Sequence, residues 1–286
     1  MTQVTNPTQP AVSLPGAGGS SVVGTTGANR LSAGNLNDII LTFGGDDVIA
    51  GNGGDDIIFS GGGNDSLGGG SGNDALVSGS GNDAVSGGDG DDRIFGGKGN
   101  DQLDGGAGND LVSGDKGNDL VLGGTGNDTL FGGEGSDTVS GGDGNDTLWG
   151  GKGSDTVDGG AGNDFISGDR GSDVLTGGAG SDTFYFATSA ATGTLDGIDT
   201  ITDFTPGEDK IRLKQGGVFA GLGTSFEASE FVVVSGFSAS SPGSTSNKLI
   251  YDPTNGALFF NGGNGVLQVA QLQPGLTITS NNFELF

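Results

Sequence analysis

The stretches Gly105-Gly-Ala-Gly-Asn-Asp-Leu-Val-Ser113 and Gly141-Gly-Asp-Gly-Asn-Asp-Thr-Leu-Trp149 are two copies of a nine-residue unit that decides the fold. The unit recurs without an insertion, and an apolar residue follows its Asp by two positions in all seventeen copies. A Gly precedes the Asp by two positions in sixteen of the seventeen. Such a short, strict period predicts a solenoid built from stacked copies. The repeated aspartates are Asp38, Asp47, Asp56, Asp65, Asp74, Asp83, Asp92, Asp101, Asp110, Asp119, Asp128, Asp137, Asp146, Asp155, Asp164, Asp173 and Asp182.

Each unit combines a turn with a short strand. Six residues rich in Gly, Asn and Asp favour a turn, because Gly and Asn adopt positive φ at little cost. The other three residues place one apolar side chain on a single face, as a very short strand does. Nine residues cannot bury an apolar layer alone, but two units can form one turn of a coil whose turns stack at about 4.8 Å. Seventeen units therefore predict about 8.5 turns.

Composition restricts the chemistry of the chain. Its 286 residues carry a net charge of −26, with 65 glycines and neither Cys nor His. Disulfides, thiolate ligands and imidazole ligands are thereby excluded. Abundant carboxylate and carbonyl oxygens favour a hard cation such as Ca²⁺. An acidic surface repels nucleic acid and anionic lipid, so neither is expected as a partner. No apolar run is long enough to predict a membrane span.

The consensus Gly-Gly-x-Gly-x-Asp-x-apolar-x resembles the repeat of the RTX, or hemolysin-type calcium-binding, family. The resemblance implies an all-β fold, with a right-handed parallel β-roll over residues 34–185 and Ca²⁺ between loops one turn apart. The seventeen aspartates would be the metal ligands, and seventeen loops allow at most 17 − 2 = 15 internal calcium sites. One apolar side chain per nine residues gives a thin core. We therefore expect the repeats to be unfolded without calcium and to fold cooperatively with it.

The period stops after Asp182, and longer apolar runs separated by turn signals predict a small all-β domain over residues 186–286. The segments 199–213 and 249–260 resemble the C-terminal region of secreted RTX proteins such as the serralysin proteases. That resemblance implies a cap on the roll and an uncleaved signal for the type I secretion apparatus, which Phe283-Glu-Leu-Phe286 fits. Asp199 matches a family position that can bind a further calcium, but Arg212 and Asn261 stand where acids are common, so an extra site is not favoured.

Residues 1–33 are predicted to be an N-terminal extension or cap. Their start has neither the basic nor the apolar region of a cleaved signal peptide. We therefore expect a secreted or cell-surface protein whose export signal lies at the C-terminus.

Alternate units lie on opposite faces of a roll, and the outward positions of the two faces differ. One face carries Phe59, Phe95, Phe131 and Trp149, whereas the other carries mainly small or polar residues. Three explanations are open for this apolar stripe. The C-terminal domain or residues 1–33 fold over it, it is a self-association or receptor surface, or aromatic residues merely suit strands.

Catalysis is not expected. The chain contains no HExxH or GxSxG motif and no His to act as a base, and only 33 residues precede the repeats. The favoured interpretation is a secreted structural or adhesive protein that folds on binding Ca²⁺ and self-assembles. The alternatives are an accessory module that aids secretion and folding of a separate partner, and a polysaccharide- or ice-binding protein.

Overall fold

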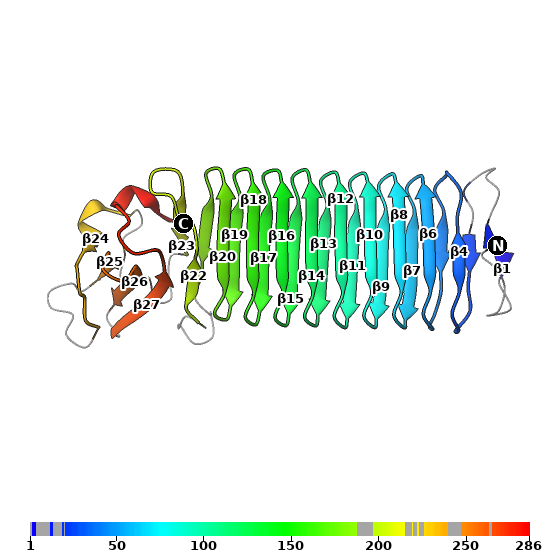
Figure 1. The fold of residues 1–286 in the computed structure, drawn as a ribbon, viewed down its shortest axis with the longest axis horizontal. Helices are drawn as coiled ribbons and strands as arrows, with labels where there is room; N and C mark the ends of the chain where they lie inside the picture. The colour runs from blue at the N-terminus through cyan, green and yellow to red at the C-terminus, as the bar shows by residue number, and fades with distance from the viewer. Residues whose placement is uncertain are drawn as a thin grey trace. The chain divides into compact units, whose positions relative to one another are not determined.

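The computed structural model describes residues 2–3, 12–13, 19, 21–187, 197–214, 219, 222, 226–239, 247–262 and 265–286 (Figure 1). The chain forms two compact units, Met1–Leu148 and Trp149–Phe286, which are described separately. This division differs from the predicted boundaries after residues 33 and 185, because repeat strands are present in both units. No helix of the described residues has the length and apolar character to cross a membrane.

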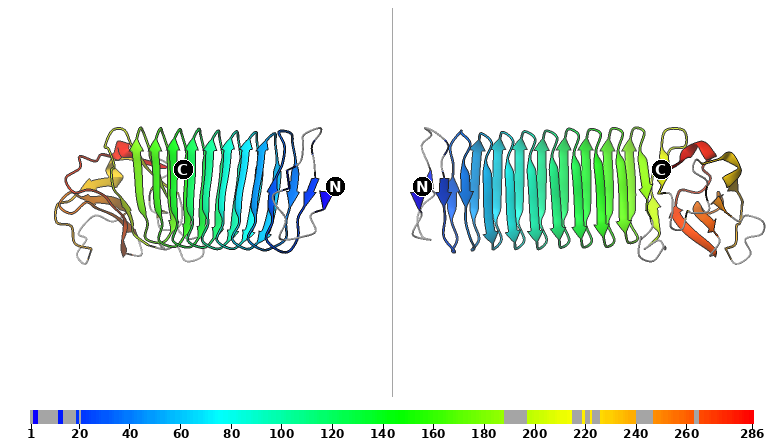
Figure 2. Two further views of the ribbon diagram at one scale, coloured as in Figure 1. Left: turned by 45° about the vertical axis from the view of Figure 1, so that its right-hand side comes forward. Right: turned by 180° about the vertical axis from the view of Figure 1, so that it is seen from behind.

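In unit 1 the odd-numbered strands form sheet A and the even-numbered strands form sheet B. Sheet A contains β1 (Thr2–Gln3), β3 (Ser21–Val23), β5 (Ile39–Leu41), β7 (Ile57–Gly62), β9 (Ala75–Ser80), β11 (Arg93–Lys98), β13 (Leu111–Lys116) and β15 (Thr129–Glu134). Sheet B contains β2 (Val12–Ser13), β4 (Arg30–Ser32), β6 (Val48–Gly53), β8 (Ser66–Ser71), β10 (Ala84–Asp89), β12 (Gln102–Ala107), β14 (Leu120–Thr125) and β16 (Thr138–Asp143). Figure 2 shows the strands of unit 1 as successive turns from two further sides.

Strand β17 (Thr147–Lys152) spans the boundary between the units. Unit 2 continues with β18 (Thr156–Ala161), β19 (Phe165–Arg170), β20 (Val174–Ala179), β21 (Thr183–Phe186), β22 (Asp199–Ile201) and β23 (Lys210–Leu213). It ends with β24 (Phe231–Val233), β25 (Lys248–Asp252), β26 (Ala257–Gly262), β27 (Gly265–Gln271), β28 (Phe283–Leu285) and two short 3₁₀ helices, η2 (Ala228–Glu230) and η3 (Ser280–Asn282). Strand β26 pairs antiparallel with β25 and β27, whereas β28 adds to β23 in parallel.

Within each unit, a repeat strand pairs in parallel with the strand two places along the chain. In sheet B of unit 1, for example, Val85 pairs with Leu103 and Leu103 with Val121. The predicted all-β class and parallel solenoid are confirmed, with about 11 turns instead of about 8.5. The count is larger because pairing begins before the first repeated Asp, at Val22 with Ile40, and continues after the last one, at Phe184 with Ile211.

Most repeat strands have six residues, not the predicted three. The glycines assigned to the turn pair in register as well, as Gly88 does with Gly106. Gly88 has φ +116°, and a side chain there would collide with the carbonyl oxygen of Gly70 in the preceding turn. Glycine therefore allows the backbone of successive loops to approach closely enough to extend the ladder.

The core is one column of apolar side chains on each sheet. Every apolar residue that follows a repeated Asp by two positions, from Ile40 to Phe184, is at most 4% exposed. The Asp of each unit is buried on the same side of the backbone. The two flanking columns face outward, as predicted from strand alternation, except at Ser167, which is buried. The fold thus places one carboxylate per turn, that is, per two units, at each edge of a thin apolar seam.

Candidate metal centre

The repeated aspartates form a hydrogen-bonded ladder along each edge of the roll. In unit 1 the backbone N–H of every repeated Asp from Asp38 to Asp128 donates to Oδ1 of the Asp one turn later, as Asp74 does to Asp92 and Asp92 to Asp110, both at 2.7 Å. The same bond joins Asp155 to Asp173 in unit 2 at 2.9 Å. This ladder, which we call the inner ladder, fixes the orientation of each carboxylate and occupies only one of its two oxygens.

The second carboxylate oxygen is buried without a hydrogen-bond donor. Such an atom is costly in a protein interior unless a cation compensates it. The eleven aspartates whose Oδ2 is in this state are Asp47, Asp56, Asp65, Asp74, Asp83, Asp92, Asp101, Asp110, Asp119, Asp128 and Asp173.

Backbone carbonyl oxygens lie near these carboxylates. Beside the Cα of Gly69 lie both Oδ2 of Asp74 and the carbonyl oxygen of Gly87, one turn away. No cluster of three or more His, Cys, Asp or Glu side chains suited to a metal was found among the described residues. An ion bound to this ladder would therefore take carboxylate and carbonyl oxygens together, which is the donor set that Ca²⁺ prefers. The residues present fit calcium.

Electrostatics also favour a cation. Burial, with a smaller contribution from the neighbouring carboxylates of Asp74 and Asp110, raises the pKa of Asp92 to about 7. Burial likewise raises the pKa of Asp56 to about 6 and that of Asp128 to about 7. Without a counter-ion, a stack of such carboxylates resists ionisation and opposes folding at neutral pH. A divalent cation between turns removes this opposition.

A second ladder runs along the exposed side of the same loops. From Asp55 to Asn145 in unit 1, the residue before each repeated Asp donates its N–H to the side-chain Oδ1 one turn earlier, as Asn82 does to Asn64 and Asn100 to Asn82, both at 2.8 Å. This outer ladder points opposite to the inner one and consists mainly of Asn. It holds adjacent loops in register without adding a charge at most turns.

All seventeen predicted ligands are buried, at 1 to 3% exposure. Asp38, at the start of the array, differs from the eleven because its Oδ2 accepts a hydrogen bond from Gly34 at 3.0 Å. That each aspartate binds calcium stays a prediction, as does the number of ions. The structure establishes that the predicted residues of each unit share one repeated, oxygen-rich environment.

The inner ladder extends past the predicted array at both ends. Asn29 donates to Asp47 at its start, and in unit 2 Asp173 donates to Asp199 and Asp182 to Asp209. Asp209 was missed as a ladder member because an insertion breaks the nine-residue spacing. The Asp-x-apolar step, which continues in 199–201 and 209–211, was the available signal. Both oxygens of Asp209 are hydrogen-bonded, the second by Thr205 at 2.7 Å, so this residue ends the ladder.

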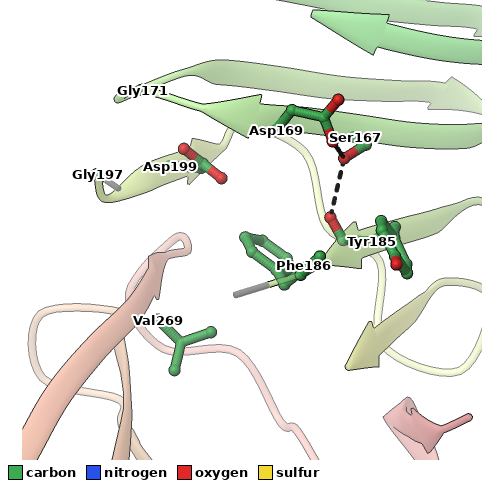
Figure 3. Close-up of a pocket in the computed structure, with 9 residues that line it drawn as sticks. Ser167, Asp169, Gly171, Tyr185, Phe186, Gly197, Asp199 and Val269 are labelled. Carbon is green, nitrogen blue, oxygen red and sulfur yellow. Dashed lines mark hydrogen bonds between the residues drawn. The ribbon is translucent and has the colours of Figure 1, made fainter. Parts of the chain in front are cut away.

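Asp199 lies at a small pocket in unit 2 (Figure 3). The pocket has a volume of about 10 Å³ and is also lined by Ser167, Asp169 and Tyr185. Ser167 Oγ donates to Oδ1 of Asp169 at 2.7 Å. Such a volume has room for roughly one water molecule, and it does not identify a further calcium site.

The outward stripe is contiguous where the pairing is described. In unit 1, Leu41, Phe59, Val77 and Phe95 follow one another in register, and Phe59 is 43% exposed. In unit 2, the rings of Trp149, Phe165, Tyr185 and Phe286 succeed one another at centroid distances of 5.1 to 6.1 Å. The C-terminal Phe286 therefore extends the aromatic row of its unit.

Comparison with known proteins identifies the repeats. A family model of the RTX calcium-binding nonapeptide repeat, which describes four copies, matches in contiguous or overlapping blocks from residue 23 to residue 187. The matched region, 187 − 23 + 1 = 165 residues, is more than half of the chain. It ends before most of the C-terminal region, so the resemblance of that region to serralysin proteases stays a prediction.

Among solved structures, the chain is similar to the AlgE6R3 subunit of the mannuronan C5-epimerase from Azotobacter vinelandii, which was determined in solution. The two are 24% identical over 58% of this chain and 79% of that chain, with a TM-score of 0.29. The search of curated proteins found no significant match. By the match of its nonapeptide units, the chain belongs to the family of RTX calcium-binding nonapeptide repeat proteins, and its repeats bind calcium.

Proposed function

We propose that this chain is a secreted structural or adhesive protein that folds on binding calcium outside the cell and then assembles at the cell surface. The observation that carries the proposal is the row of buried Asp Oδ2 atoms without hydrogen-bond donors. Such a row opposes folding where calcium is scarce and supports it where calcium is abundant. A chain of this kind stays unfolded before export and folds after it.

Calcium binding also changes the charge on which assembly depends. With 15 ions, the number that seventeen loops allow, the net charge changes from −26 to −26 + 30 = +4. Copies that repel one another without calcium are then nearly neutral, so that apolar contacts can hold them together. The outward stripe around Phe59 supplies such a contact in unit 1, because its apolar side chains lie in register on adjacent parallel strands and Phe59 is exposed.

The chemistry of the chain supports a non-enzymatic role. It has no His, no Cys and no motif of a known hydrolase, and its carboxylates are arranged as a uniform array instead of a single pair. Export through a type I apparatus is part of the proposal. It is supported by the acidic and apolar ending Phe283-Glu-Leu-Phe286.

The test combines circular dichroism with light scattering during one calcium titration of the full chain. We expect a coil spectrum in EGTA, a cooperative gain of β-structure with calcium and a rise in mass afterwards. The double variant Phe59→Ser with Phe95→Ser should fold at the same calcium concentration and show less association. A spectrum unaffected by EGTA would refute calcium-dependent folding, and a monomeric wild-type chain at saturating calcium would refute self-assembly.

A further inference from the structure

The positive charges of the repeats are confined to one sheet. Strands β6 to β20 contain five Lys or Arg residues, all of them in odd-numbered strands, and four of the five occupy the last position of their strand. These residues are Arg93, Lys98, Lys116, Lys152 and Arg170. The even-numbered strands of the same range carry acidic residues and no cation. In a chain with a net charge of −26, this segregation marks one edge of sheet A as a candidate site for an anion.

In unit 1 this edge contains an open groove of about 420 Å³. Gly79 and Gly97 form part of its lining without a side chain, and Lys98, Asp115, Lys116 and Glu134 complete it. Lys98 pairs in register with Lys116, so two like charges stand one turn apart, which is unfavourable unless an anion joins them. Lys116 forms a 3.3 Å salt bridge with Glu134. No carboxylate of the described residues lies within salt-bridge distance of Lys98.

Asp115 adds a strained feature to the groove. Its backbone has φ +70°, and the residues that pair with it on the two neighbouring strands are both glycine, Gly97 and Gly133. An L-residue in this conformation costs on the order of 1 kcal/mol. Ser113 Oγ donates to Asp115 Oδ1 at 2.7 Å and holds the carboxylate in place. Strain kept beside a groove is typical of a functional position.

Unit 2 contains the same arrangement. Asp169 has φ +65°, accepts a hydrogen bond from Ser167 Oγ at 2.7 Å and precedes Arg170 (Figure 3). The local sequence, Ser-Gly-Asp-Lys-Gly in unit 1 and Ser-Gly-Asp-Arg-Gly in unit 2, therefore recurs with its geometry. The motif and its backbone geometry thus occur in both units, and the groove is described for the copy in unit 1.

We propose that the groove bounded by Lys98 and Lys116 binds an acidic carbohydrate, a chain of uronic acid units. The lysines pair with sugar carboxylates, and the carboxylates of Asp115 and Glu134 accept hydrogen bonds from sugar hydroxyls. A uronate offers both kinds of partner, a carboxylate for Lys98 beside the Lys116–Glu134 ion pair and hydroxyl donors for the remaining lone pairs of Asp115 and Glu134. Inorganic phosphate would meet two carboxylates, and a nucleic acid base would find no aromatic ring among the lining residues.

A second copy of the chain fits this groove less well. A second copy would need two carboxylates one turn apart to pair with Lys98 and Lys116. At the last positions of the even-numbered strands, Asp89 pairs in register with Ser71 on one side and Ala107 on the other, so that edge does not offer them. The groove is built from adjacent turns of the roll. The proposal therefore rests on the proposed calcium-dependent folding.

Isothermal titration calorimetry of the full chain at saturating calcium tests the proposal. The probe is a uronic acid tetrasaccharide, and the control ligand is a neutral glucose tetrasaccharide. We expect binding of the acidic sugar alone, weakened about tenfold by Lys98→Gln with Lys116→Gln, since each exposed ion pair contributes up to about fivefold. Arg93→Gln removes the same charge from the same strand outside the groove and should change affinity less than twofold.

Four results would overturn the proposal. The uronate could give no heat at millimolar concentration, or the neutral sugar could bind equally well. Arg93→Gln could weaken binding as much as Lys98→Gln with Lys116→Gln does, or the chain could dimerise with calcium in a way that only the lysine variants abolish. The last result would assign the groove to a second copy. Circular dichroism reports folding separately. A chain folded without calcium would refute the proposed function and leave the sugar titration to decide the groove.

Discussion

Replacing Asp92 by Asn tests whether the inner ladder exists for its charge. The side chain of Asp92 is 1% exposed, its Oδ1 accepts a hydrogen bond from Asp74, and its Oδ2 has no donor. Asn keeps the acceptor at Oδ1 and replaces Oδ2 with an N–H donor. That donor would lie beside Gly87, where the carbonyl oxygen of Gly105 is also found. The substitution therefore removes a charge and a metal ligand without removing the ladder bond.

The magnitude follows from two opposing effects. A pKa of about 7 in place of 3.8 means that ionised Asp92 destabilises the metal-free roll by about 4 kcal/mol at pH 7.5, and Asn removes this penalty. Asp92 also faces two candidate calcium sites, one toward Asp74 and one toward Asp110. Each site contributes RT ln(1 + [Ca²⁺]/Kd), which reaches about 2 kcal/mol when calcium is roughly thirty times Kd. Asp92→Asn should therefore stabilise the roll below that concentration and destabilise it above.

Urea unfolding at a series of calcium concentrations measures this crossover. The free energy of unfolding should rise with ln[Ca²⁺] at a slope that is smaller by two bound ions in the variant. Asp91→Asn is the control, because it removes the same charge from the adjacent, exposed residue, whose Oδ1 serves only the outer ladder. If Asp92→Asn and Asp91→Asn give the same slope, or if neither differs from the wild type, the inner ladder does not bind calcium and the reasoning fails.

Three further outcomes are expected. Burial raises the pKa of the inner aspartates, so the folded metal-free roll binds more protons than the unfolded chain between pH 3.8 and about 7. Circular dichroism without calcium should therefore show a gain of β-structure when the pH is lowered from 8 to 5, and a loss of β-structure would contradict this reasoning. Gly88→Ala should raise the calcium midpoint of folding several-fold through its collision with Gly70, whereas Gly68→Ala, with open space and no positive φ, should leave it unchanged. Leu103→Ala should lower the free energy of unfolding in calcium by about 2 to 5 kcal/mol; the exposed neighbour change Gln102→Ala should cost less than 1 kcal/mol, and equal losses would count against the apolar seam.

The nine-residue period predicted the fold because every unit has its Asp and its apolar residue at the same positions. Asp-x-apolar fixes which side chains face inward, and the same spacing brings Asp74, Asp92 and Asp110 to one edge. The ends of the ladder could not be found this way. Asn29 lacks the carboxylate used to count units, and Asp209 follows an insertion, although both are followed by an apolar residue at the second position.

Hydrogen-bond direction was also beyond the sequence. Asn and Asp side chains both accept hydrogen bonds. Their positions in the sequence therefore do not tell whether a given Oδ1 accepts from the backbone N–H of the next turn or of the previous one. The structure separates an inner ladder that points to the next turn from an outer ladder that points to the previous one. The strained Asp115 was likewise hidden, because its φ depends on the stacking of Gly97 and Gly133 around it.

The difference between the two ladders indicates what calcium does for this fold. Both ladders use a backbone N–H donor, yet the outer one uses either Asn or Asp as the side-chain acceptor, whereas the inner one holds Asp in all seventeen units. If the bond alone mattered, Asn would serve the inner ladder equally well and would avoid a buried charge. We infer that hydrogen bonds set the backbone register and that calcium would act mainly by neutralising the second carboxylate oxygen. We therefore expect an inner ladder of Asp to keep the metal-free roll unstable where Asn would not, and this instability to make folding depend on calcium.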